Sequence, residues 1–252
     1  MSRHATFCTW EEAPHLTEEA KAELLASIPP FQRDARTKGI PQLGAGAIFP
    51  IPEEEIRVKD FQIPSHWARA YAMDHGWNWL GAVFMAYNRE TRTKYLYSCY
   101  KRAQAEPPIH AAAIKARGDW LPGVGDCSDI NKYDGQQFLK IYRGLGLDLK
   151  LANKAVEAGL QETWMELSTG SLKVFASCEE WFAEYRLYHR DEQGRIVKVN
   201  DHLIDPTRYL VRAGATLFKT EVEARHGTKK VRDPFERFAR GRSGGTDGWM
   251  GN

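Results

Sequence analysis

The apolar positions in the first half of the chain form three closely spaced runs. They cover residues 67–78, 79–87 and 94–100, and a polar turn at 88–93 separates the last two. Apolar and aromatic runs of this length, bounded by turn residues, are typical of strands. The pattern therefore predicts a three-stranded meander, with Asp74 near the end of its first strand.

Helical and extended patterns alternate after this meander. Helices are predicted over 107–117, 133–142, 155–166 and 178–186, and strands over 121–126, 147–151 and 172–175. A meander followed by helix–strand alternation predicts an α/β fold, in which a mixed sheet carries helices on its faces.

Two further elements are predicted toward the C-terminus. A basic hairpin is expected over residues 186–199, with its turn at 191–194. A last helix is expected to end near Val211, and its start has two readings. Either Asp205 caps the helix and Pro206 opens it, or the helix starts at Asp201 and lacks one backbone hydrogen bond.

The two ends of the chain differ in composition from its middle. Residues 1–60 contain one predicted helix, over 17–27, and are otherwise rich in glycine and proline, which predicts a connector that packs along a larger body. Residues 61–213 are expected to form the main domain. Residues 214–252 are polar and basic, with a Gly- and Ser-rich end, so we predict a disordered and dispensable tail.

Composition excludes several classes of protein. The net charge is only +2, from 35 Lys and Arg against 33 Asp and Glu, so any basic surface must come from local clustering. The four cysteines are scattered without a Cys-x-x-Cys pair, which argues against a zinc site or a disulfide framework. No phosphate-binding Gly-x-x-x-x-Gly-Lys-Ser/Thr motif is present, so no nucleotide motor is expected. No apolar run approaches the ~18 residues of a membrane span, and the first residues lack a signal peptide, so we expect a soluble intracellular protein.

Three aspartates stand at the ends of predicted elements. Asp74 and Asp126 end strands, and Asp205 lies at the start of the last helix. A single aspartate at such a place is more often a turn former or a cap. Three together offer oxygen ligands of the kind that Mg²⁺ and Mn²⁺ prefer, with His202 and Asp201 as further candidate ligands.

This arrangement suits phosphodiester hydrolysis. A pair of metal ions about 3.5–4 Å apart activates the attacking water and stabilises the leaving oxygen, and one carboxylate bridges the two ions. Asp74, on the most central strand, is the expected bridge, with Asp126 on one ion and Asp205 on the other.

The predicted hairpin is the best candidate for contact with a phosphate backbone. Its basic residues alternate with tyrosines and include Arg186, Arg190, Arg195 and Lys198. An ordinary solvated edge hairpin would have the same composition. If the hairpin is functional, it either clamps DNA or covers the metal site, and the sequence leaves both readings open.

Three segments resemble the nuclease domain of tailed-phage terminase large subunits of the headful type. They are Ala72-Met-Asp74-His-Gly76, Gly125-Asp-Cys-Ser128 and, most specifically, Asn200-Asp-His-Leu-Ile-Asp-Pro-Thr-Arg-Tyr209. Family members carry Asp-His-Ala-x-Asp-Ala-x-Arg-Tyr in the last of these segments, where the second aspartate and sometimes the histidine bind metal. By position these roles fall to Asp205 and His202, while Pro206 stands where the family usually has alanine. The resemblance covers roughly residues 9–212.

The resemblance implies a ribonuclease H-like fold over residues 61–213. It also implies cutting of concatemeric double-stranded viral DNA in the host cytoplasm, with two Mg²⁺ or Mn²⁺ ions and little sequence preference. The expected partners are an ATPase motor domain, which this chain lacks, a portal protein and a small terminase subunit. Two alternatives stay open: a resolvase- or transposase-like nuclease of the same fold, and a non-catalytic DNA- or portal-docking module whose acids are structural.

Overall fold

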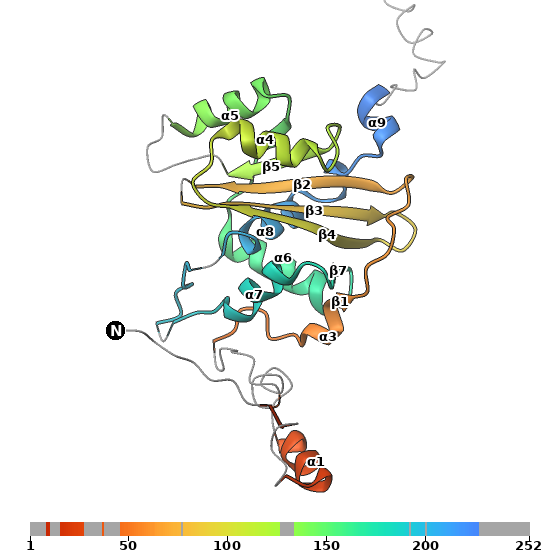
Figure 1. Ribbon diagram of the computed structural model, residues 1–252, viewed down its shortest axis with the longest axis vertical. Coiled ribbons are helices and arrows are strands. Elements are labelled where there is room, and N and C mark those ends of the chain that lie inside the picture. Colours follow the sequence, from red (N-terminus) through yellow and green to blue (C-terminus); the bar gives the residue numbers. More distant parts are fainter. Residues whose placement is uncertain are drawn as a thin grey trace, which may run out of the picture.

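A mixed β-sheet runs through the middle of the protein, with helices on both of its faces (Figure 1). The computed structural model describes residues 9–10, 16–27, 37, 46–76, 78–126, 134–191, 193–199 and 201–226. The strands are β1 (Arg57–Val58), β2 (Ala68–His75), β3 (Leu80–Asn88), β4 (Thr93–Arg102), β5 (Pro122–Asp126), β6 (Asp148–Leu151) and β7 (Leu172–Phe175). The helices are α1 (Glu18–Ser27), α3 (Glu53–Ile56), α4 (Pro107–Lys115), α5 (Asp134–Gly144), α6 (Val156–Ser168), α7 (Glu179–Leu187), α8 (Ile204–Ala213), the 3₁₀ helix η3 (Ala215–Leu217) and α9 (Glu221–His226).

The sheet combines antiparallel and parallel pairs. Within the described residues its order is β1-β7-β4-β3-β2-β5-β6. β2, β3 and β4 form the antiparallel meander, and the outer strands pair in parallel with their neighbours. The predicted α/β architecture with a mixed sheet is confirmed. Among the helices that the structure describes, none has the length and apolarity needed to cross a bilayer.

The alternation of side chains along β2 divides the core into two clusters. Ala70 and Ala72 belong to the cluster that packs against α6, α7 and α8. Tyr71 and Met73 belong to the other, which packs against α4 and α5. Figure 1 shows these two sets of helices on opposite sides of the sheet. Because successive residues of a strand point to opposite faces, Asp74 continues the α8 side.

The segment before β2 contributes more to the core than the connector prediction implied. Phe49, Ile51 and Ile56 are buried, and β1 adds an edge strand beside β7. The Phe49 ring packs between those of Tyr185 and Tyr188, at centroid distances of 6.0 and 5.9 Å. Residues 46–58 thus belong to the folded body. The single predicted helix of this region is present as α1.

The hairpin predicted over residues 186–199 is present, but it is shorter than expected. Its first two residues belong to α7, which continues to Leu187. Its first strand also bonds to the connector: the Ile48 N–H donates to the Tyr188 carbonyl (3.2 Å), and the Arg190 N–H donates to the Gly46 carbonyl (2.8 Å). Burial of Tyr188 against Phe49 draws the chain there. The pairing itself consists of an antiparallel bridge between Arg190 and Ile196. Two backbone hydrogen bonds accompany it: the Asp191 N–H donates to the Arg195 carbonyl (2.8 Å), and the Val197 N–H donates to the His189 carbonyl (3.0 Å).

The structure also differs from the prediction of disorder after Gly214. Leu217 and Phe218 are buried in the core, and Lys219 pairs with Arg69 of β2 through an isolated bridge. α9 then follows, and its Glu223 accepts two hydrogen bonds from Arg89, of 2.7 and 2.8 Å. The buried apolar residues, the bridge to β2 and the Arg89–Glu223 pair together attach this segment to the sheet. Residues 227–252 lie outside the described part of the chain.

Candidate metal centre

The three predicted aspartates come together at one end of the sheet. Asp74 is the next-to-last residue of β2 and lies in register with Asp126, the last residue of β5. Both strands run in the same direction, so both deliver their final carboxylates to the same edge. Asp205 comes from the first turn of α8, which packs across β2 and β5 on the face to which Asp74 points.

α8 begins at Ile204, between the two predicted starts. Its first hydrogen bonds follow the second reading, because the Asp205 N–H bonds to the Asp201 carbonyl, Pro206 leaves one bond out, and the Thr207 N–H bonds to the Leu203 carbonyl at 3.3 Å. Glu184 of α7 is buried, and its carboxylate accepts the Leu203 N–H at 2.6 Å, in the manner of a helix cap supplied from elsewhere. Asp201 stays outside the helix, and its carbonyl accepts the Asp205 N–H at 2.9 Å. Pro206 then falls in the first turn, where a missing N–H costs little. The cap is a long-range contact that local sequence could not indicate.

The carboxylates act on one another electrostatically. The pKa of Asp74 is raised to about 7, first by burial and then by the negative charges of Asp205, Asp126 and Asp201, while Lys198 opposes the shift. Burial also raises the pKa of Asp205, Arg208 counteracts it, and Asp201 adds to it. Like charges crowded in a desolvated place resist ionisation, and a bound cation would remove that cost.

Basic side chains engage two of the three aspartates. Arg208, almost fully buried, reaches Asp205 with Nη2 at 3.1 Å from Oδ1. Lys154, from the loop between β6 and α6, places Nζ 2.6 Å from Asp126 Oδ2. Lys154 did not stand out in the sequence, because nothing local indicates that its loop returns to the end of β5.

Tyr209 is a second residue that sequence reasoning did not single out. Its hydroxyl donates to Asp74 Oδ1 at 3.5 Å, and burial, followed by Asp74 and Asp205, raises its pKa. It lies four residues after Asp205 and therefore on the same face of α8. That spacing, visible in the motif, was the signal that could have revealed it.

The lesser candidate ligands are placed differently. Asp201 acts on Asp74 and Asp205 electrostatically. His202 lies with its ring 6.2 Å from that of Trp79, and burial followed by Lys101 lowers its pKa, against the effect of Asp201. The described residues contain no group of three or more His, Cys, Asp and Glu side chains already arranged to hold a metal ion. The chemistry of the oxygen donors and their mutual repulsion nevertheless suit a hard divalent cation.

The basic residues of the expected hairpin do not act as a group. Arg186 pairs with Glu53 (Nη2–Oε2 3.1 Å), Arg190 with Glu157 (2.6 Å) and Arg195 with Asp191 (3.0 Å). Lys198 differs, because its charge reaches Asp74 and Asp205. Of the four candidates, it is the one that the structure brings to the carboxylates.

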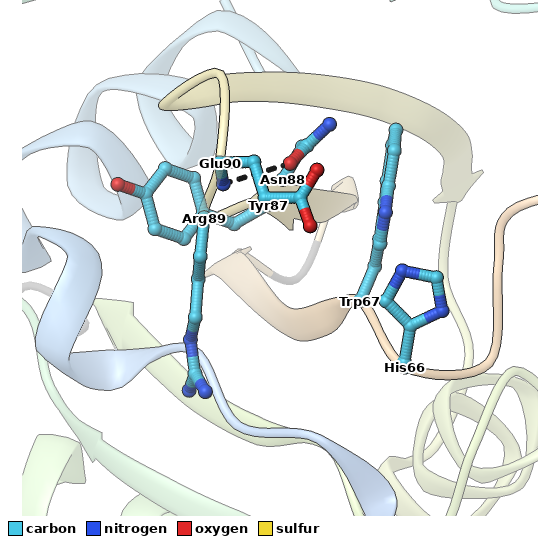
Figure 2. A pocket seen from close by; sticks show the side chains of 6 residues that line it. All are labelled: His66, Trp67, Tyr87, Asn88, Arg89 and Glu90. Carbon is cyan, nitrogen blue, oxygen red and sulfur yellow. Dashed lines mark hydrogen bonds between the residues drawn. The ribbon is translucent and has the colours of Figure 1, made fainter.

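The opposite end of β2 and β3 carries a separate pocket, which Figure 2 shows from close by. Its cavity of about 120 Å³ is lined by His66, Trp67, Tyr87, Asn88, Arg89 and Glu90. The Glu90 N–H donates to Asn88 Oδ1 at 2.9 Å, so part of its wall is the β3–β4 turn itself. Its volume is too small for most organic ligands, and we assign it no role.

Comparison with known proteins agrees with this fold. No family model matches the chain. The terminase large subunit of Salmonella phage P22 is 33% identical over 243 residues, which are 92% of this chain and 48% of that protein. The chain thus spans about half the length of this relative. The similar region includes segments outside the catalytic core, which favours the terminase reading over a resolvase.

Solved structures show the same relationship. The P22 large terminase nuclease domain superposes with a TM-score of 0.66 at 31% identity, over 72% of this chain and 98% of that one. The large terminase nuclease of thermophilic phage G20c with bound magnesium has a TM-score of 0.51 at 12% identity, over 68% of this chain and 98% of that one, and shares the fold. The mixed sheet with its acidic edge therefore defines a domain of the ribonuclease H-like class, as expected. This chain belongs to the family of phage terminase large subunit nuclease domains.

Proposed function

We propose that this chain is a metal-dependent endonuclease that cuts concatemeric double-stranded viral DNA during genome packaging. One observation carries the proposal: Asp74, Asp126 and Asp205 lie together at one end of the sheet. There burial, followed by the charges of Asp205 and Asp126, raises the pKa of Asp74. The membership of the family supports it. The motor domain, the portal protein and the small subunit are the partners we propose, in the host cytoplasm and with little sequence preference at the cut.

The same three carboxylates would hold two Mg²⁺ or Mn²⁺ ions, with Asp201 and His202 in supporting positions. Such ions would supply an activated water and stabilise the leaving oxygen of the phosphodiester. The chain's own residues prepare the site. Tyr209 orients Asp74 by donating to its Oδ1, and buried Arg208 fixes Asp205 through its ion pair. Lys198 adds positive charge where the DNA phosphate would approach.

Nicking of supercoiled plasmid tests this function. The chain should convert plasmid to nicked and linear forms at millimolar Mn²⁺ but not in EDTA, and Asp126→Asn and Asp205→Asn should each abolish the conversion. If the unaltered chain leaves plasmid intact at every Mn²⁺ concentration, the carboxylates are structural, and a docking module becomes the better description.

Lys154→Gln should tighten metal binding. The ammonium group occupies an oxygen of Asp126 that a cation would need, and its charge repels the cation. We expect the dissociation constant for Mn²⁺, measured by titration calorimetry, to fall about fivefold or more, because the effective dielectric near a protein surface leaves such charge effects above about 1 kcal/mol. Lys150→Gln, an exposed position on β6, is the matched control. Equal affinities of the parent and Lys154→Gln would contradict the competition.

Lys198 should dominate the salt dependence of DNA binding. Each phosphate contact adds about 0.9 to the slope of log affinity against log salt. Since Arg190 and Arg195 are already in ion pairs, Lys198→Ala alone should lower that slope by about 1, and adding Arg190→Ala and Arg195→Ala should change it little further.

The same variants distinguish a clamp from a cover. Cleavage rates of the parent, the single variant and the triple variant are compared at two salt concentrations. If the segment holds DNA, both variants should cut more slowly than the parent, and by the same factor for every DNA sequence. Faster cleavage by the triple variant would mean that the segment restrains access to the site, and unchanged rates at both concentrations would exclude both roles.

A further inference from the structure

A cavity of about 560 Å³ opens beside the carboxylates and has a different chemical character. Its described lining residues come from the segment just before β3, the loop after β4 and the segment before α8, and include Asn78, Trp79, Gln104, Lys198, Val199 and His202. No carboxylate is among these lining residues. An aromatic face, two amides and a cation suit a neutral ring attached to a phosphate.

Trp79 is held in place while remaining accessible. Its side chain is 41% exposed, and it also lines a second cavity, of about 330 Å³. Lys101 lies over the indole, with Nζ 4.9 Å from the ring centroid, and is itself tied to the buried carboxylate of Glu184 at 2.6 Å. A fixed, exposed indole is a surface on which another flat ring can stack with little loss of side-chain entropy.

The cavity shares residues with the candidate metal centre. Lys198 lines it and acts electrostatically on Asp74 and Asp205. His202 lines it and directly follows Asp201. Gln104, another lining residue, holds a left-handed backbone conformation (φ 45°), which non-glycine residues rarely adopt and which often accompanies ligand sites. A DNA strand whose phosphate lies at the carboxylates would therefore bring its next nucleoside to this cavity.

We propose that this cavity binds one unpaired nucleoside of the DNA strand next to the phosphate that is cut, with the base stacked on Trp79. A base in an intact duplex has its faces covered, so the ligand is a nucleotide that has left its stack, at a strand end or by flipping out. The inference rests on the proposed nuclease function and adds to it which part of the substrate is held and by which residues.

Binding of short oligonucleotides in EDTA tests the cavity without cleavage. Trp79→Ala should weaken binding of a fluorescein-labelled oligothymidylate of about 12 residues roughly tenfold or more, and binding of the matching duplex less than about threefold. Trp79→Phe, which keeps an aromatic face, should lose less than about threefold. Trp164→Ala is the matched control, because Trp164 is a similarly exposed tryptophan (44%) on α6.

The result that overturns the inference is equal oligothymidylate affinity of Trp79→Ala and Trp164→Ala, tighter binding by Trp79→Ala, or equal loss for the single strand and the duplex. Plasmid nicking in Mn²⁺ separates this failure from that of the function. If the parent nicks plasmid and Trp79→Ala binds like the parent, the cavity assignment fails and the nuclease stands. If the parent does not nick plasmid, both fail.

Discussion

Asp74→Asn is expected to abolish cleavage and, in the absence of metal, to stabilise the fold. The substitution removes the expected bridging ligand, so plasmid nicking in Mn²⁺ should fall at least about 100-fold. It also removes a carboxylate that burial and the charges of Asp205, Asp126 and Asp201 make costly to ionise. We expect a melting temperature in EDTA at about pH 8 that is higher by several degrees.

The pH dependence of this stabilisation follows from the sign of the shift. The folded-state pKa of about 7 lies above the ordinary value of 3.8, so the folded protein holds a proton that the unfolded chain has lost. The parent should therefore lose stability as pH rises from about 4 to 7, and Asp74→Asn should not lose that part. The gain should be larger at about pH 8 than at about pH 5.

Two comparisons make the result specific. Asp148→Asn alters an exposed carboxylate at the start of β6 and should change neither cleavage nor the pH dependence. Mn²⁺ should raise the melting temperature of the parent more than that of Asp74→Asn, because a ligand stabilises only the state that binds it. Retained cutting, or a clear loss of stability in EDTA, would contradict the assignment. Asp129, which lies outside the described residues, is a further control, and Asp129→Ala should still cut DNA. An inactive Asp129→Ala variant would indicate that Asp129, and not Asp126, is the required carboxylate after this strand.

Phe218→Ala is expected to destabilise the fold severely. Phe218 is 2% exposed, packs on Tyr87 with ring centroids 5.7 Å apart, and attaches the segment after α8 to the core. Truncating a buried phenylalanine costs about 3–5 kcal/mol. For a protein of this size, the melting temperature should fall by roughly 6–20 °C, which a thermal unfolding curve would measure.

Truncations locate the boundary of the folded body. A chain ending at Ala213 should be destabilised still further, because it loses Leu217, Phe218 and the ion pair between Arg89 and Glu223. A chain ending at His226 keeps these contacts and should melt within about 2 °C of the parent. If the chain ending at Ala213 melts like the parent, the burial of Phe218 contributes nothing to stability and the tail from Gly214 onward is dispensable after all.

The sequence alone determined the elements of the sheet and the positions of its acids. The meander, the later strands and the helices between them follow from contiguous apolar runs and turn residues, which act over a few neighbours along the chain. The aspartates at strand ends were visible for the same reason. Parallel neighbouring strands end at the same edge of a sheet, so Asp74 and Asp126 could be expected to lie together. The register of β2 and β5 shows that they do.

Tertiary structure alone decided the contacts between distant segments. Glu184 sets where α8 begins, Lys154 reaches Asp126, and Tyr188 packs on Phe49 from a distant part of the chain. Each of these depends on which surfaces meet once the two faces of the sheet are covered, and burial there outweighs the local preference of the chain. The candidate centre therefore has ligands that can be predicted from sequence and a surrounding set of charges that only the folded arrangement reveals.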